Sequence, residues 1–259
     1  MTAFRLRCAI GSIVTHQRSI HAPGVCAFAC VLALLLSPSI AAAAEAGRIY
    51  ESHRGFRIMV PEGWTTLDSQ TPYPRFEQLA RRFSGFEEIG EAIRRQEIEL
   101  YMIDAASSPP PPTINVIVRP GTIPINDRTR RAFEAELAKQ AQAVEGTIRQ
   151  IDDIHFIEVR GRQRGLGGMV RQWQYVTSGR HYTYIITFTA PAHGVSRYEP
   201  VFESVIAGFQ APDVVAGLHR GGGWFDHPAT LGAAIGGAIG IAVAAFLFDR
   251  KRRRRASAQ

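Results

Sequence analysis

The hydrophobic pattern at the start of the folded segment changes from a strand period to a helix period. Two short strands are predicted at 48–54 and 55–64, and in the second Phe56, Ile58 and Val60 alternate with other residues and face inward. A helix is predicted over 73–96, because aromatic and aliphatic residues recur there on one stripe. Ser84-Gly85 marks a possible break within it, since glycine weakens a helix.

The pattern then repeats the order of strands followed by a helix. Strands are predicted at 98–106 and 113–119, on either side of four consecutive prolines. A helix is predicted from residue 126 or 127 through 145, where either side chain could provide the N-cap.

Three antiparallel strands and a last helix complete the domain. The strands are predicted at 147–162, 169–177 and 181–189, and the helix begins after Ser196. Strands and helices do not alternate regularly along the chain. The order therefore predicts an α+β fold, with an antiparallel β-sheet packed between helices.

Residues 1–44 have the three parts of a secretory signal peptide. Arg5, Arg7 and Arg18 precede an apolar run from Val25 to Leu36, and small residues follow. Those 12 apolar residues are fewer than the about 20 that a membrane-spanning helix needs. We expect a cleaved signal, with an uncleaved anchor as the alternative. All three cysteines lie in this segment, so the expected mature chain has no thiol for disulfides, catalysis or zinc.

The uncharged residues 228–248 are predicted to form a single transmembrane helix. These 21 residues would make a helix about 31 Å long, close to a hydrocarbon core of about 30 Å. A basic cluster follows, which places the tail 249–259 in the cytoplasm by the positive-inside rule. The topology-determining residues are Arg250, Lys251, Arg252, Arg253, Arg254 and Arg255.

This topology predicts the location of each part of the chain. The domain 45–211 would be periplasmic or extracytoplasmic, joined by the Gly-rich linker 212–227 to a bacterial inner (plasma) membrane span. Gly221-Gly222-Gly223-Trp224 leaves an alternative open, since a Gly-rich motif, a span and a basic tail also resemble a C-terminal sorting signal that a protease removes.

Small residues recur along one face of the predicted span. They are Gly232, Gly236, Gly240 and Ala244. Small residues let two helix backbones approach closely, so this face is a candidate glycine-zipper seam for homo-oligomerisation. The alternative is that Gly and Ala are simply tolerated in a weakly apolar span.

The net charge of +7 does not indicate nucleic-acid binding. Of the 30 basic residues, three lie in 1–44 and six in 250–255, so 45–249 holds 21 bases against all 23 acids. The basic character therefore belongs to the two termini. The composition, 46% hydrophobic and 20% charged, is that of a globular protein and excludes a disordered chain or a multi-span transporter.

The common catalytic motifs are missing from the sequence, and we expect no enzyme activity, cofactor or metal site. Neither HExxH, GxSxG, a Walker A loop nor an EF-hand loop is present. Asp153 and His155, two residues apart, could hold an ion or act as an acid–base pair, although a solvated strand face is the simpler interpretation.

A basic stretch and an aromatic pattern are the remaining candidate sites. Arg160, Arg162 and Arg164 alternate with uncharged residues and are a possible interaction edge for anionic headgroups or an acidic partner; the alternative is a charged edge strand that resists pairing. Period-two aromatics around Trp173 and Tyr184 are interpreted as core.

The segment 48–211 resembles the PsbP-like superfamily, including its DcrB-type bacterial envelope members. The resemblance rests on GFRIMVPEGW in the first hairpin, and on YIITFTAP and RYEPVFESVIAGF at the end of the domain. It implies an antiparallel sheet between helices, no catalytic residues and service as an interaction or assembly module. We therefore expect a non-enzymatic, membrane-anchored module with an unknown envelope partner. The alternative is binding of a small apolar ligand or lipid in a pocket of about 300 Å³ or more lined by aromatics.

Overall fold

The computed structural model describes residues 47–83, 85–165 and 168–214, all within one compact unit of the chain. The predicted signal peptide, transmembrane helix, glycine seam and basic tail lie outside these residues. Within the described ranges, no helix is both long enough and apolar enough to cross a membrane.

A small hairpin opens the described chain. Strands β1 (Arg48–Glu51) and β2 (Arg57–Val60) pair antiparallel, with Arg48 opposite Val60. Gly55 occupies the turn at a φ of 86°, a conformation that glycine adopts without steric cost. Both predicted strands are therefore present, although each is shorter than the sequence pattern indicated.

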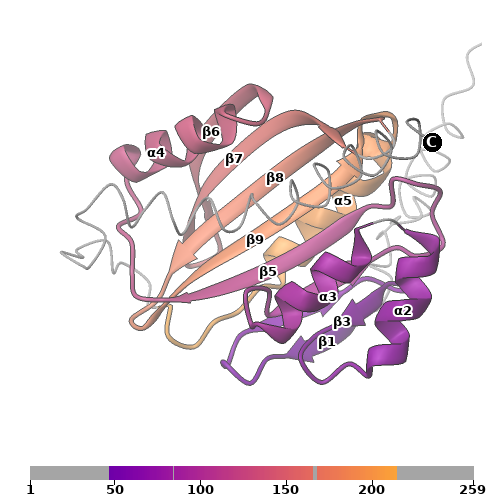
Figure 1. Ribbon diagram of the computed structural model, residues 1–259. Coiled ribbons are helices and arrows are strands. Elements are labelled where there is room, and N and C mark those ends of the chain that lie inside the picture. Colours follow the sequence, from indigo (N-terminus) through magenta and orange to yellow (C-terminus); the bar gives the residue numbers. More distant parts are fainter. Residues whose placement is uncertain (1–46, 84, 166–167, 215–259) are drawn as a thin grey trace, which may run out of the picture. The chain divides into compact units, whose positions relative to one another are not determined.

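Seven further strands form one antiparallel sheet in the order β3-β4-β5-β9-β8-β7-β6 (Figure 1). Their bounds are β3 (Thr65–Leu67), β4 (Leu100–Ile103), β5 (Thr113–Pro120), β6 (Gln142–Ile151), β7 (Ile154–Gly165), β8 (Gly168–Ser178) and β9 (Tyr182–Pro191). Every neighbouring pair is antiparallel. The strand order leaves β3 and β6 as the two edge strands.

Four α-helices and one 3₁₀ turn accompany the sheet in the described part of the chain. They are α2 (Tyr73–Arg82), α3 (Phe86–Arg94), α4 (Asp127–Ala138), η1 (Ala192–Gly194) and α5 (Val195–Ala207). The predicted break at Gly85 is confirmed: this residue separates α2 from α3 with a left-handed φ of 86°. Asn126 caps α4, because its side chain accepts a hydrogen bond from the Thr129 backbone nitrogen at 2.9 Å.

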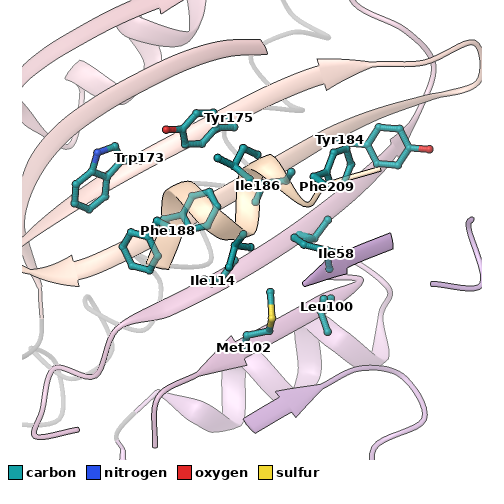
Figure 2. Close-up of a cluster of buried hydrophobic side chains, with 14 of the residues drawn as sticks. Ile58, Leu100, Met102, Ile114, Trp173, Tyr175, Tyr184, Ile186, Phe188 and Phe209 are labelled. Carbon is teal, nitrogen blue, oxygen red and sulfur yellow. The ribbon is translucent and has the colours of Figure 1, made fainter. Parts of the chain in front are cut away.

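The sheet has helices on both faces, as the α+β prediction required. Helix α5 and the β1–β2 hairpin cover one face over an aromatic core (Figure 1). Figure 2 shows Trp173 and Tyr175 of β8 beside Ile186 and Phe188 of β9 in that core. Helices α2, α3 and α4 pack on the opposite face in a second hydrophobic cluster.

Two predicted elements are wrong in extent. The helix predicted to residue 145 ends at Ala138, and β6 begins at Gln142 with a bulge in which Ala143 takes a φ of 50°. The strand predicted at 147–162 is divided between β6 and β7 by a turn at Asp152, also at φ 50°. The predicted three-stranded meander is therefore four strands.

The folded contacts continue past the predicted domain boundary at residue 211. The Asp213 carboxylate accepts hydrogen bonds from the Tyr184 hydroxyl at 2.5 Å and from the His181 backbone nitrogen at 3.2 Å. Its backbone oxygen accepts another from the Arg180 nitrogen at 2.9 Å. Asp213 thereby fixes the end of the described chain against the β8–β9 turn.

Candidate ligand-binding site

The three arginines predicted to form an interaction edge lie on β7, which is an inner strand for most of its length. Arg160 pairs with Glu145 of β6 and with Trp173 of β8. Arg162 is the last residue of β7 that pairs with β6, opposite Gln142. The charged-edge interpretation is therefore wrong for Arg160 and Arg162, because β6 pairs with β7 at both positions. Arg164 lies past the first residue of β6 and pairs only with Met169 of β8.

Arg160 forms ion pairs within the domain. Its guanidinium bonds to the carboxylate of Glu158 and lies 3.7 Å from that of Glu199 on α5. Glu158 itself is only 1% exposed and also accepts a hydrogen bond from the Tyr175 hydroxyl at 3.1 Å. Burial, reinforced by the negative charge of Glu158, raises the pKa of Tyr175 above its ordinary value, so this hydroxyl stays protonated and donates.

A second arginine extends this network to α5. Arg149 of β6 holds Glu203 of α5 through two hydrogen bonds, at 2.9 and 2.6 Å, and lies 3.7 Å from Glu158. The bond from Arg149 lowers the pKa of the Glu203 carboxyl below its ordinary value. The network thus joins α5 to the sheet, and we assign it a structural role.

Arg162 and Arg164 stand beside a hollow at the end of the β7–β8 hairpin where β7 ends and β8 begins. The hollow has a volume of about 390 Å³. Its lining residues are Gln140, Gln142, Arg162, Gln163, Arg164, Gly168 and Met169. Both arginines are exposed and form no ion pair with another described residue. Met169, 43% exposed, adds an apolar contact beside the two charges.

A row of uncharged polar side chains crosses the sheet on the face that carries α4. The row consists of Asn115 on β5, Thr187 on β9 and Gln174 on β8, together with Gln172. Thr187 lies directly opposite both Asn115 and Gln174, and Gln172 is two residues before Gln174 on the same face of β8. We call these four residues the polar row. Because neighbouring strands lie about 4.8 Å apart, the three aligned residues extend about 10 Å across the sheet.

The polar atoms of the row are buried, yet they find no hydrogen-bond partner among the described residues. These atoms are Asn115 Oδ1, Thr187 Oγ1, Gln172 Nε2 and both Nε2 and Oε1 of Gln174. Gln172 and Gln174 are each 1% exposed. A buried polar atom without a partner costs about 1–3 kcal/mol, so several in one row are unusual for a sheet that is otherwise packed with aliphatic and aromatic side chains.

The row is connected to the hollow and lies between two helical regions. Gln163, which lines the hollow, donates a hydrogen bond from Nε2 to Oε1 of Gln172 at 2.7 Å. On one side α4 packs on β7: a Cβ added at Gly161, opposite Gln172, would lie 3.2 Å from Leu137 Cδ2. On the other side α3 packs on β4, where Phe86 contacts Tyr101 edge to face.

Asp153 and His155, considered from the sequence as an acid–base pair or ion site, lie at the start of β7. Asp153 is exposed in the turn before β7, whereas His155 is half-buried within that strand. No group of three or more potential metal ligands occurs within residues 47–83, 85–165 and 168–214.

The aromatic residues that would have lined an apolar ligand pocket belong to the core. Trp173 packs edge to face on Phe202 with ring centroids 5.5 Å apart, and Tyr184 packs on Phe209 at 5.6 Å. Neither Trp173, Tyr182 nor Tyr184 lines the hollow described above. The core interpretation of these aromatics is therefore confirmed.

Sequence reasoning missed the polar row. In QWQY and TFT, the aromatics were correctly predicted to face inward, and the residues between them would ordinarily face solvent. The available signal was the recurrence of amides and hydroxyls at alternate positions of three strands. Only the register shows that these strands are neighbours.

The chain is similar to several solved structures. Cyanobacterial PsbP from Synechocystis matches with 13% identity and a TM-score of 0.41, over 64% of this chain and 93% of that one. LpqN of Mycobacterium tuberculosis, described as involved in cell envelope biogenesis, matches with 14% identity and a TM-score of 0.38, over 65% and 86%. A Bacteroides thetaiotaomicron protein matches with 12% identity and a TM-score of 0.41, and this chain covers 48% of its length.

No protein-family model and no curated protein sequence matches the chain. The similarities above concern the arrangement of strands and helices, and the functional argument below uses the residues of this chain alone.

Proposed function

We propose that the protein is a non-enzymatic, membrane-anchored extracytoplasmic interaction module that docks an acidic partner protein of the cell envelope at the β7–β8 hairpin. The observation that carries this proposal is the hollow of about 390 Å³ flanked by Arg162 and Arg164. Their charges are exposed and unpaired within the described part of the chain.

The chemistry of this end suits an anionic group. A guanidinium offers five N–H donors in a planar fork that matches a carboxylate with two parallel hydrogen bonds. The amides of Gln140 and Gln142 line the same hollow and can complete the hydrogen bonds of a bound side chain. Met169 supplies a flexible apolar surface next to the charges, a combination common at protein interfaces.

The predicted topology supports the choice of compartment. A signal peptide at 1–44 and a span at 228–248 would hold the domain at the outer face of the inner membrane, and the seam at Gly232, Gly236 and Gly240 would favour homo-oligomers. The resemblance to PsbP-like and DcrB-type envelope proteins is consistent with such a module.

The test is a cross-linked pull-down of the full-length, detergent-solubilised protein, read by mass spectrometry. The variant Arg162→Gln/Arg164→Gln removes both charges at the hollow. The control Arg128→Gln/Arg131→Gln removes the same charge from the exposed face of α4, where neither residue lines the hollow. We expect an envelope protein that is recovered with the wild type and the control and is lost with the hairpin variant.

Salt dependence provides an independent check. Capture should weaken as ionic strength rises, because contacts between exposed charges are screened. Equal recovery of every partner by the hairpin variant and the control would refute docking at Arg162 and Arg164.

A further inference from the structure

The outer edge of β6 is a long stretch of unpaired strand. β6 is the last strand of the seven-stranded sheet and pairs, within the described residues, only with β7. Strand edges are usually kept short or carry proline or lysine, because their free backbone groups can pair with another chain. β6 is 10 residues long and contains neither residue, and its bulge lies near its start, at Ala143. Residues 145–151 therefore form a regular, open edge.

The hairpin geometry identifies the backbone groups that point outward from this edge. Ile151 and Ile154 close a two-residue turn, so this pair exchanges hydrogen bonds, and bonded and unbonded pairs alternate from there along β6. The amides and carbonyls of Gly146 and Ile148 therefore face away from β7. Arg130 of α4 supports this direction, since its guanidinium reaches the Gly146 carbonyl oxygen at 3.3 Å. These outward groups bond to no backbone group of another described segment.

We propose that two copies of the protein pair antiparallel through β6, about a two-fold axis at Thr147, and so extend one sheet across both copies. Thr147 then lies opposite Thr147 of the second copy. The amide and carbonyl of Ile148 meet those of Gly146 of the second copy, and the symmetry repeats this pair. The Gly146 carbonyl can accept this bond as well as that from Arg130, because it has two lone pairs.

Charge complementarity favours a second copy as the partner and selects this register. Glu145 and Arg149 each lie two residues from Thr147, so each Glu145 falls directly opposite Arg149 of the other copy on one face of the sheet. Glu145 is exposed. Arg149 uses Nη1 and Nη2 for Glu203, and its Nε forms no hydrogen bond with a described residue. An axis at Glu145 or at Arg149 would set like charges opposite each other, which is destabilising.

The exposed apolar side chain of β6 also fits this register. Ile148 is 36% exposed, and Gly146 of the second copy would lie opposite it, where there is no side chain to obstruct it. Pairing would remove part of the Ile148 surface from water, which is favourable. Glycine is required at 146 by α4, because a Cβ there would lie 2.5 Å from Glu134 Oε1.

This contact goes beyond the docking function proposed for the β7–β8 hairpin, and either can fail without the other. It also lies within the folded domain, whereas the predicted seam at Gly232, Gly236 and Gly240 belongs to the span. The test therefore needs a readout that depends on position along β6, because a seam in the span could hold two copies together on its own.

The experiment is oxidative disulfide cross-linking of the full-length, detergent-solubilised protein in a Cys8→Ser/Cys26→Ser/Cys30→Ser background, which removes every native thiol. Thr147→Cys places two thiols at the axis. Cα atoms of such an unbonded antiparallel pair are about 4.5 Å apart, within the range of about 4.4–6.8 Å that a disulfide spans. The matched control is Gln150→Cys, at an exposed position of the same strand, where the two Cα atoms would be about 20 Å apart.

We expect Thr147→Cys to form a disulfide-linked dimer with a yield at least about tenfold above that of Gln150→Cys. Adding Glu145→Arg should lower this yield severalfold, because it sets like charges opposite each other at two places in the dimer. Glu77→Arg, the same change on the exposed face of α2, should leave the yield unchanged. Circular dichroism would establish that each variant is folded.

Three results would overturn the proposal. A folded Thr147→Cys variant that forms no disulfide-linked dimer, or equal yields at 147 and 150, would exclude pairing of two copies through β6. An undiminished yield with Glu145→Arg would refute the register that the charges select. In host membranes, a disulfide from Thr147→Cys to a different protein, without the self-linked dimer, would assign this edge to another partner.

Discussion

Tyr175 donates a hydrogen bond from its hydroxyl to Oε1 of Glu158 at 3.1 Å, between two side chains that are almost fully buried. The same carboxylate also bonds Arg160 and lies 3.7 Å from Arg149. One buried negative charge therefore coordinates a phenol and two guanidinium groups at the junction between the sheet and α5.

Replacing Glu158 should destabilise the domain strongly. Glu158→Ala would leave the Tyr175 hydroxyl and the Arg160 guanidinium without their buried partner, and breaking a buried pair in this way costs about 3–5 kcal/mol. Urea unfolding followed by circular dichroism would measure the loss. Glu145→Ala, at an exposed position of the adjacent strand, is the control and should change the free energy of unfolding by less than about 0.5 kcal/mol.

Acid should weaken the attachment of α5 through Glu203. Its pKa is lowered in the folded state by Arg149, so an unfolded chain takes up the proton first as the pH falls. The stabilisation is fully present at neutral pH and is lost as the pH drops from the ordinary glutamate pKa through the lowered folded value.

The comparison that isolates this effect is urea unfolding of Glu203→Gln across that acidic range. This variant should be less stable than the wild type at neutral pH, and the difference should shrink in acid. Glu77→Gln, on the exposed face of α2, should leave the shape of the wild-type pH profile unchanged. A difference that persists undiminished in acid would contradict the assignment.

Removing the cap of α4 should cost a moderate amount of stability. Asn126→Ala deletes the oxygen that accepts from the Thr129 backbone nitrogen, and losing such a cap costs about 1 kcal/mol. Asn126→Asp keeps an acceptor at the same place and should retain most of the wild-type thermal midpoint. Equal midpoints for the alanine variant and the wild type would show that the cap contributes nothing.

The end of the folded domain can be tested by truncation. Signal-less chains ending at residue 214 and at residue 211 differ in whether Asp213 can accept from Tyr184 and from the β8–β9 turn. Burial and the Asp213 carboxylate raise the pKa of Tyr184, so this phenol is a donor at neutral pH and needs its acceptor. We expect the shorter chain to be less stable by about 1–3 kcal/mol in calorimetry. Asp213→Asn in the longer chain keeps an acceptor and should fall between the two.

The sequence was sufficient to predict elements with a strong hydrophobic period. Phe76 and Leu79 define α2, Phe202 and Val205 define α5, and the aromatic alternation of β8 and β9 marks the core. It was insufficient where local conformation overrides the period. Ala141 continues the helical stripe of α4 and is buried, but the chain leaves the helix before it and turns through Ala143 at positive φ.

The candidate sites depend on non-local pairing, which no single segment encodes. Arg162 could be recognised as part of a basic stretch, but its place beside a hollow depends on β6 beginning opposite it at Gln142. Likewise, Asn115 and Gln174 lie 59 positions apart in the chain, and they join one row only because each lies directly opposite Thr187 of β9. Long-range register is thus the missing information.

The hydrogen bonds of Asp213 hold the end of the described chain at one end of the sheet. Asp213 is fixed at the β8–β9 turn, whereas the hollow lies at the other end of β8, which is 11 residues long. At about 3.3 Å per residue, the two ends are separated by roughly 35 Å, most of the length of the sheet. The described chain therefore ends at the end of β8 that is farthest from Arg162 and Arg164, and the length of the sheet separates residue 214 from the proposed docking end.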